Sequence, residues 1–239
     1  MSNINEKFFR VLLISTLFLF CAHCGYTADK SLVAYWSFDE ISGDVVKDIS
    51  GNGHDATVKG ATYEKAGIGH CLSFDGSSNE VVVPGFSDLP TTEITVLVWQ
   101  KADNSKMQST FSVSPDDGLD RINAHIPWGG GTVFWDFGNI DTDGRLSYVP
   151  ADSITGEWQH FAFVASQSGD YMKIYRNGVE EASKPGMSPY SGTEKDFCIG
   201  SLAGGLFFGG MIDEVKIYKR ALTEKEIEAE YRSGMKVLQ

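Results

Sequence analysis

The sequence predicts an all-β protein, a sandwich of two antiparallel sheets with a short C-terminal helix. Short segments rich in β-branched and aromatic residues recur along the chain, with turn-forming residues between them. Within many of these segments inward and outward positions alternate, which is the period of a strand. Asn177-Gly178 separates two such segments, and this pair is the strongest short signal for a β-hairpin.

The expected strands follow one another along the whole chain. The first, 32–38, is apolar on both faces, so we expect it to be covered on both sides. A polar loop that ends in the turn formers of 50–53 separates it from the next strand. The other expected strands are 55–58, 71–74, 80–83, 94–100, 109–113, 121–126, 132–137, 146–149, 158–165, 171–176, 179–183, 197–200 and 207–218.

One helix is expected after the last strand, over about 224–232. Thr223 and Glu226 have the spacing of a capping box, in which each side chain bonds the other residue's backbone N–H. Gly234 is a natural helix stop. We expect this helix to seal the sandwich and its run of glutamates to face solvent.

The first 28 residues are interpreted as a secretory signal peptide, which leaves residues 29–239 as one jelly-roll-sized domain. A charged start with Lys7 and Arg10 precedes an apolar run over 11–22. That run is too short to span a bilayer and has the form of a signal sequence. The sequence therefore predicts an exported protein.

The position of the cut is open between two interpretations. Ala28 is the expected cleavage residue of an ordinary signal peptide. The alternative is a lipoprotein anchored at Cys21 or Cys24, but the residues before these cysteines fit a lipoprotein cleavage signal poorly. We therefore favour a secreted or extracytoplasmic protein without a lipid anchor.

Composition excludes several classes of partner. The net charge of −12 argues against nucleic acid and anionic membrane surfaces, because both require a basic footprint. No segment after the signal peptide is long and apolar enough to suggest a transmembrane span. Roughly 210 residues follow the signal peptide, which is a usual length for a single all-β domain.

Cys71 and Cys198 are the two cysteines beyond the signal peptide. Leu72 and Ile199 beside them are expected to face inward, which places both cysteines on the other side of their strands. In an oxidising compartment this favours a disulfide bond, and two inert buried thiols are the alternative. Sequence does not show that the two Cα atoms come close enough.

Asp213 is the most informative acid of the last strand. Alternation puts it on the same face as Val215 and Ile217, which we expect to pack inward. A buried carboxylate requires a cation or several hydrogen-bond donors. The sequence therefore predicts a special role for Asp213.

The stretch over 121–137 is the best candidate for a binding surface. Alternation turns Arg121, Asn123 and His125 away from the core in one strand, and Phe134 and Asp136 in the next. Aromatic rings beside planar polar groups form the mixture that a sugar site uses.

Two neighbouring residues extend this candidate site. Trp128 lies between a proline and three glycines and is expected to be exposed, and Arg145 is expected to join through the loop before 146–149. The candidate ligand-binding residues are therefore His125, Trp128, Phe134, Asp136 and Arg145. The alternative is an ordinary polar outer face, with Trp128 folded over the core as a lid.

Eight pieces of the chain, taken in order, resemble one family. They are LVAYWSFD at 32–39, DISGNG at 48–53, LSFDG at 72–76, TVLVW at 95–99, WQH at 158–160, IYRNG at 174–178, IDEVKIY at 212–218 and RALT at 220–223. Together they resemble the laminin-G-like jelly-roll family of the concanavalin A-like lectin/glucanase superfamily. The resemblance extends over essentially all of 31–233 and implies a secreted jelly roll that serves as a binding or adhesion module.

The resemblance also implies one structural calcium ion and, in many relatives, a disulfide. In similar jelly rolls calcium lies where the last strand meets the first. The matching positions are Asp213, Gly76 in the loop after Phe74, and Asp39, with carbonyls and waters completing the shell. The alternative is that Asp213 caps backbone amides of a neighbouring loop.

Glucanases of this fold carry a set of catalytic acids, and we searched the sequence for the same set. Retaining glucanases need two carboxyl groups about 5 Å apart, which they place on one strand as Glu-x-Asp-x-Glu. The nearest match, Glu194-Lys195-Asp196, is followed by no second glutamate. No nucleophile elbow, zinc motif or phosphate loop is present either. We therefore expect no enzymatic activity.

Three hypotheses follow. The leading one is a secreted, non-catalytic module that recognises carbohydrate or a glycosylated surface, with a structural calcium ion. The second is an adhesion or structural module that binds a cell-surface protein. The third is a polysaccharide-degrading enzyme without the usual motif, such as a lyase built on isolated His, Tyr and Arg residues.

Overall fold

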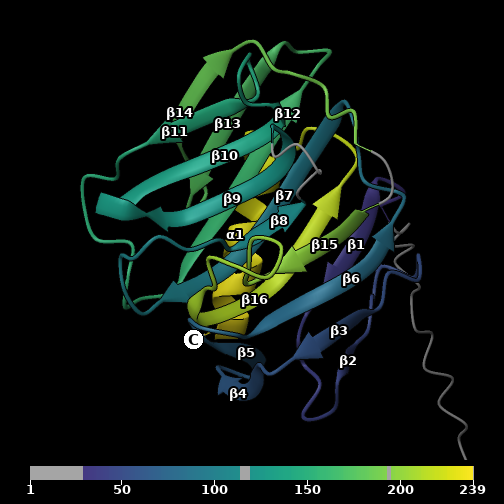
Figure 1. The fold of residues 1–239 in the computed structure, drawn as a ribbon, viewed down its shortest axis with the longest axis vertical. Helices are drawn as coiled ribbons and strands as arrows, with labels where there is room; N and C mark the ends of the chain where they lie inside the picture. The colour runs from purple at the N-terminus through teal and green to yellow at the C-terminus, as the bar shows by residue number, and fades with distance from the viewer. Residues whose placement is uncertain (1–28, 114–118, 193–194, 239) are drawn as a thin grey trace, which may run out of the picture.

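The computed structural model describes residues 29–113, 119–192 and 195–238 (Figure 1). They form two antiparallel sheets packed face to face, with one helix, α1 (Glu224–Leu238), on the outer face of one sheet. The predicted all-β sandwich with a C-terminal helix is therefore confirmed. The predicted signal peptide, with Cys21, Cys24 and Ala28, lies outside the described residues.

Sheet A contains both the first and the last strand. Its order is β14-β13-β12-β7-β16-β5-β4, and β1 also pairs with β16. Its strands are β1 (Leu32–Trp36), β4 (Thr62–Ala66), β5 (Gly69–Asp75), β7 (Glu93–Ala102), β12 (Gln159–Ser166), β13 (Tyr171–Arg176), β14 (Val179–Pro185) and β16 (Gly209–Tyr218).

Sheet B has the order β11-β10-β9-β8-β15-β6-β3-β2. Its strands are β2 (Val45–Val46), β3 (Ala56–Lys59), β6 (Glu80–Phe86), β8 (Phe111–Val113), β9 (Asp120–Trp128), β10 (Thr132–Asn139), β11 (Arg145–Tyr148) and β15 (Lys195–Ile199). The short 3-10 turn η1 (Gly129–Gly131) joins β9 to β10.

Two of these strands, β2 and β4, were not expected from the sequence. Each lies at the edge of its sheet, and neither carries a long apolar run. The predicted hairpin is confirmed, because Asn177 and Gly178 join β13 to β14 with φ angles of 51° and 81°. Two positive φ angles match the twist of the flanking strands, and asparagine followed by glycine adopts them readily.

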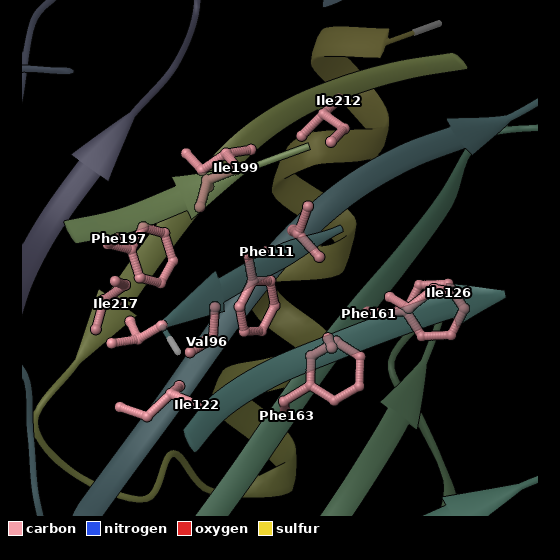
Figure 2. Packing of buried hydrophobic residues seen from close by; sticks show 14 of the residues in the cluster. Val96, Phe111, Ile122, Ile126, Phe161, Phe163, Phe197, Ile199, Ile212 and Ile217 are labelled. Atoms are coloured by element: carbon pink, nitrogen blue, oxygen red, sulfur yellow. The ribbon is translucent and has the colours of Figure 1, made fainter. Parts of the chain in front are cut away.

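Aromatic side chains from both sheets fill the space between the sheets (Figure 2). The ring of Phe111 from sheet B lies 5.7 Å from Phe163 of sheet A and 5.7 Å from Phe197, measured between centroids. The buried Trp135 of sheet B donates a hydrogen bond from its indole nitrogen to the Val164 carbonyl of sheet A at 3.1 Å. The two layers are therefore joined by ring packing and by a direct polar contact.

Helix α1 covers the outer face of sheet A. Ile227 is fully buried there, and Tyr231 stacks on Trp99 with 5.6 Å between ring centroids. The helix continues past Gly234, which we expected to end it. A Cβ atom at Gly234 would clash with the Trp99 indole nitrogen. This glycine therefore allows close helix–sheet contact and does not mark a stop.

Strand β16 changes its neighbour halfway along. β7 pairs with it on one edge, whereas on the other edge β5 pairs with 209–212 and β1 with 215–218. Asp213 is opposite Trp99 while Lys216 is opposite Leu97, so β16 has one extra residue and a bulge between them. Glu214 within the bulge has a φ of 53°.

The bulge corrects the predicted orientation of Asp213. Ile212, Val215 and Ile217 all lie in the core between the sheets. Strict alternation cannot place both Ile212 and Val215 inward, and the extra residue makes it possible. Asp213 is instead opposite Trp99 on the outer side, in the layer beneath α1. The prediction that Asp213 faces the same way as Val215 is therefore wrong.

The cysteines do not form the expected disulfide. Cys71 packs with Trp99 on the outer side of sheet A, and Cys198 lines the outer side of sheet B. Both thiols are buried and free. Both side chains do turn away from the core, as predicted, but the sandwich separates them. Burial raises the pKa of Cys71 to about 12 and that of Cys198 to about 11.

Within the described part of the chain, no helix is long and apolar enough to cross a bilayer.

The start of α1 gives a first testable prediction. The Glu226 carboxylate accepts a hydrogen bond from the Thr223 N–H at 2.8 Å, and the Glu226 N–H donates to the Thr223 hydroxyl at 3.4 Å. Thr223→Ala should lower the free energy of unfolding by about 1 kcal/mol, because it removes the capping oxygen. Urea unfolding followed by circular dichroism measures it, and Thr223→Ser, which keeps the hydroxyl, should match the unmodified protein. Equal stability of the alanine and serine variants would contradict the capping role.

Candidate functional site

The predicted binding residues lie together on the outer face of sheet B. His125 pairs with Phe134, and Asp136 pairs with Asn123 on one side and Arg145 on the other. The neighbours of these residues along β9 and β10 face the core. The sequence therefore identified the correct face of both strands.

Asp136 is fully buried and holds Arg145 in place. The Nε and Nη2 groups of Arg145 donate to the two Asp136 oxygens at 2.7 Å each, and Arg121 Nη1 lies 3.9 Å away. The hydrogen bonds to Asp136 raise the pKa of Arg145 above its usual value. The guanidinium carbon of Arg145 lies 5.0 Å from the centroid of the Phe134 ring. Asp136 therefore positions the arginine and has no exposed surface for a ligand.

Trp128 joins Phe134 through a further ring contact. Its ring centroid lies 6.1 Å from that of Phe134 and 4.6 Å from that of His125. Trp128, Phe134 and Arg145 are half-buried, so each keeps some accessible surface. We refer to these three residues as the aromatic platform. Its rings and guanidinium can stack on a sugar and bond its hydroxyl groups.

His125 lies beneath the platform and is nearly inaccessible. It is 3 % exposed, and burial lowers its pKa to about 4, so the imidazole is neutral at physiological pH. Its Nδ1 has no hydrogen-bond partner among the described residues, and neither does either amide atom of the fully buried Asn123 beside it. His125 therefore packs against Trp128 with almost no accessible surface, and its expected role as a direct ligand contact stays a prediction.

A hollow that sequence reasoning missed opens on the same face, over β3, β6, β15 and β8. Its volume is about 660 Å³. Lys59, Glu80, Ser112, Asp196 and Cys198 contribute to its lining. Strand register connects it to the platform through one outward row across six neighbouring strands, with one residue from each strand: Val82, Cys198, Ser112, Asn123, Asp136 and Arg145.

The hollow could not be found from a local pattern. Its residues come from four strands and one turn that are far apart in sequence, and those on neighbouring strands form no recognisable sequence motif. The available signal was alternation, which turns Cys198 outward. Strand order, which the sequence did not supply, was needed to bring these residues together.

The residues predicted to bind calcium separate into two places. Asp213 is 1 % exposed, and burial raises its pKa to about 9, with further contributions from the charges of Glu214 and Asp39. The Asp213 carboxylate accepts a hydrogen bond from the Glu214 N–H at 2.9 Å. Asp39 accepts one from the His70 N–H at 3.1 Å, at the start of β5. Asp213 and Asp39 are therefore close enough to interact electrostatically, and Asp39 lies at the start of β5.

Gly76 does not belong to this pair. It follows the far end of β5, where its N–H donates to the Phe208 carbonyl at 3.0 Å. At about 3.3 Å per residue, the length of β5 puts roughly 20 Å between the two ends. The loop after Phe74 is organised instead by Asp75, which accepts hydrogen bonds from the Ser77 and Ser78 N–H groups. The prediction that Gly76 shares a site with Asp213 is therefore wrong.

Among the described residues, no group of three or more His, Cys, Asp and Glu side chains is arranged to hold a metal ion. A cation between Asp39 and Asp213 would therefore depend on backbone carbonyls and water for most of its six to eight oxygens.

Comparisons with known proteins agree on one fold. The family model Laminin_G_3, described as the concanavalin A-like lectin/glucanases superfamily, matches residues 75–228. A search of curated proteins found no match.

Similar solved structures are binding domains. Domain 4 of AbnA, a GH43 extracellular arabinanase from Geobacillus stearothermophilus in complex with arabinotriose, matches with a TM-score of 0.64 and 22 % identity, over 84 % of this chain and 98 % of that one. The binding domain of Paraclostridial Mosquitocidal Protein 1 (TM-score 0.65, 15 % identity) matches over 87 % of this chain and 53 % of its own. The botulinum neurotoxin serotype D binding domain (TM-score 0.67, 14 % identity) matches over 85 % and 52 %. This chain therefore spans about half of each toxin domain, and the expected jelly roll is confirmed.

The pairing of Arg145 with Asp136 gives a second testable prediction. Arg145→Ala should lower the free energy of unfolding by about 2 kcal/mol, because it leaves the buried Asp136 carboxylate without its two strongest donors. Chemical denaturation measures the change. Arg232→Ala, which removes an exposed arginine bonded to Glu228 on α1, is the matched control and should leave the midpoint unchanged. Equal effects of the two substitutions would contradict the positioning role of Asp136.

Proposed function

The chain belongs to the concanavalin A-like lectin/glucanases superfamily, and we propose that it is an exported, non-catalytic module that recognises carbohydrate on the outer face of sheet B. One observation carries the proposal: α1 covers the outer face of sheet A, whereas sheet B presents the aromatic platform and a hollow on its outer face. Within the described residues, sheet B has no helix over it.

The chemistry of the platform supports a sugar ligand. Trp128 and Phe134 offer ring faces that can stack against the C–H groups of a sugar, while Arg145 keeps a fixed planar donor beside them. Domain 4 of the arabinanase, which shares the fold, is described in complex with arabinotriose. An arabinose-containing oligosaccharide is therefore the first ligand to test. That arabinanase is extracellular, which agrees with the signal sequence expected at the N-terminus.

The state of the acids on this face supports a role without catalysis. A glycosidase needs one carboxyl group that stays protonated and a second one across the scissile bond. Asp136 is bonded at both oxygens by Arg145. Although burial alone would raise the pKa of Glu80, hydrogen bonds from Ser201 and Lys59 hold it below its usual value. Glu80 therefore favours its ionised form, and both oxygens of Asp136 are occupied by Arg145.

A structural calcium ion between Asp213 and Asp39 is the second part of the proposal. Asp213 is a buried carboxyl with a second acid close by and one backbone donor, and a divalent cation would offset the cost of ionising it. The bulge at Glu214 and the ends of β1 and β5 surround this pair, so backbone carbonyls are available to complete the shell. The ion would hold the first and last strands together and would not take part in a reaction.

A glycan screen tests the first part. The purified protein is applied to an array of plant, bacterial and animal glycans that includes arabinotriose, and each hit is measured by calorimetry. Trp128→Ala should weaken binding at least tenfold, because an aromatic side chain that stacks on the ligand contributes more than about 1 kcal/mol to binding. Trp99→Phe, which changes a tryptophan under α1, should leave the affinity unchanged. Absence of any glycan hit, together with capture of a protein through the same face, would favour the adhesion hypothesis instead.

The dependence of stability on pH and on calcium tests the proposed calcium ion. The Asp213 carboxyl keeps its proton up to pH 9 in the folded chain but loses it near pH 4 when unfolded, so stability should fall as pH rises between these values by at most about 1.4 kcal/mol per pH unit. Calcium should replace that proton and raise the melting temperature by several degrees at pH 8. Asp213→Asn should remove both the pH dependence and the calcium effect.

The control for this experiment is Asp75→Asn. It changes the acid that ends β5, at the end of the strand far from Asp213, so the difference between calcium and chelator should remain. An unmodified protein whose melting temperature is the same in calcium and in chelator would show that the ion is absent and that Asp213 is a protonated cap.

A further inference from the structure

The hollow over β3, β6, β15 and β8 differs from the platform in its chemistry. None of the described residues that line it is aromatic. Its volume of about 660 Å³ falls within the range of roughly 300–1,000 Å³ that is usual for small-molecule sites. A ligand here would be recognised by hydrogen bonds and shape, and not by ring stacking.

One wall of the hollow is fixed by buried hydrogen bonds. Ser201 is fully buried, and its hydroxyl donates to Glu80 Oε2 at 2.6 Å. The Ser112 hydroxyl donates to the Ser201 carbonyl at 2.8 Å. These bonds anchor the turn that carries Ala203 and Gly204, both of which line the hollow. The cavity is therefore formed before any ligand arrives, which reduces the entropy cost of binding.

The rim of the hollow has a donor and an acceptor that can form further hydrogen bonds. The Lys59 ammonium donates to Glu80 Oε1 at 2.9 Å, and an ammonium has three N–H groups. The Asp196 carboxylate accepts from the Gly85 N–H at 2.9 Å through Oδ1, and its residue is exposed. An ammonium and a carboxylate at one rim can bond neighbouring hydroxyl groups of one sugar, the first as donor and the second as acceptor.

Among the described residues of the lining, positive and negative charges are equal in number. Lys59 and Lys195 contribute two positive charges, and Glu80 and Asp196 contribute two negative charges. A ligand carboxylate or amine therefore meets as many like charges as opposite charges and gains no net attraction from the lining. Like charges brought together at an interface cost several kcal/mol, so both kinds of ligand are disfavoured. Hydroxyl groups meet no such penalty.

From this geometry we infer that the hollow is a second carbohydrate subsite, separate from the aromatic platform, that binds an uncharged sugar through the Lys59 ammonium and the Asp196 carboxylate. The inference rests on the proposed function for its class of ligand and adds the place and the charge of the sugar. The protein would then hold a glycan at two points of one sheet face, one by stacking and one by hydrogen bonds.

Calorimetry with the full chain tests this inference. The probes are arabinotriose and a set of other uncharged trisaccharides, with trigalacturonic acid as a charged trisaccharide. The unmodified protein should bind an uncharged trisaccharide at two sites, and the charged one should not enter the hollow. Lys59→Ala and, separately, Asp196→Asn should weaken one of the two binding events by about tenfold or more, because each removes a charge-assisted hydrogen bond.

The matched control is Lys47→Ala. Lys47 is another exposed lysine that pairs with an aspartate, Asp55, and it does not line the hollow. This substitution should leave both binding events unchanged. Lys59 and Asp196 are at the rim, and a thermal melt of each variant verifies that the fold is retained.

The possible results of these titrations distinguish the second subsite from the proposed carbohydrate-binding function. Binding that Trp128→Ala abolishes and that neither rim substitution affects would overturn the second subsite and leave the proposed function intact. Binding of trigalacturonic acid that Lys59→Ala weakens would overturn the assignment of an uncharged ligand. Failure of every trisaccharide to bind the unmodified protein would overturn the proposed function together with this inference.

Discussion

The pairing of β16 is the constraint on which the remainder of the fold depends. This strand runs through sheet A with β7 along one edge, and with β5 and β1 end to end along the other (Figure 1). One extra residue at Asp213 and Glu214 lets the strand pass from one neighbour to the next without turning its apolar side chains out of the core. The same bulge buries an acid beneath α1, at the gap between the first strand and β5.

The two outer faces of the sandwich consequently differ. On sheet A, α1 packs over Trp99 and buries Cys71 and Asp213, so that face contributes stability and has little surface for a ligand. On sheet B, the outward row of polar residues connects the aromatic platform with the hollow. Buried partners hold the accessible groups in place on this face: Asp136 bonds Arg145, and Glu80 bonds Lys59. We therefore propose that recognition takes place on the face that the helix leaves open.

The sequence predicted most of the fold and the residues of the aromatic platform, because patterns among neighbouring residues determine both. Alternation placed Asn123, Phe134 and Asp136 on the correct face, and the capping box located the start of α1. Alternation gave the wrong face for Asp213, because the bulge reverses the alternation and no sequence pattern marks the bulge. Alternation also does not predict burial, and the structure buries Asp136 completely. The hollow and the separation of the cysteines depend on strand order, which is a property of the whole fold.

The central claim is that the outer face of sheet B is the working surface. Titration of the isotopically labelled protein with a glycan that binds it, followed by the backbone amide signals, tests this claim most directly. The account predicts that shifted amides gather in β9, β10, β11 and β15, with little change in α1 and in β12 to β14. Shifts that gather instead on α1 and on the edge strand β14 would contradict it, because they would place the ligand on the face that the helix covers.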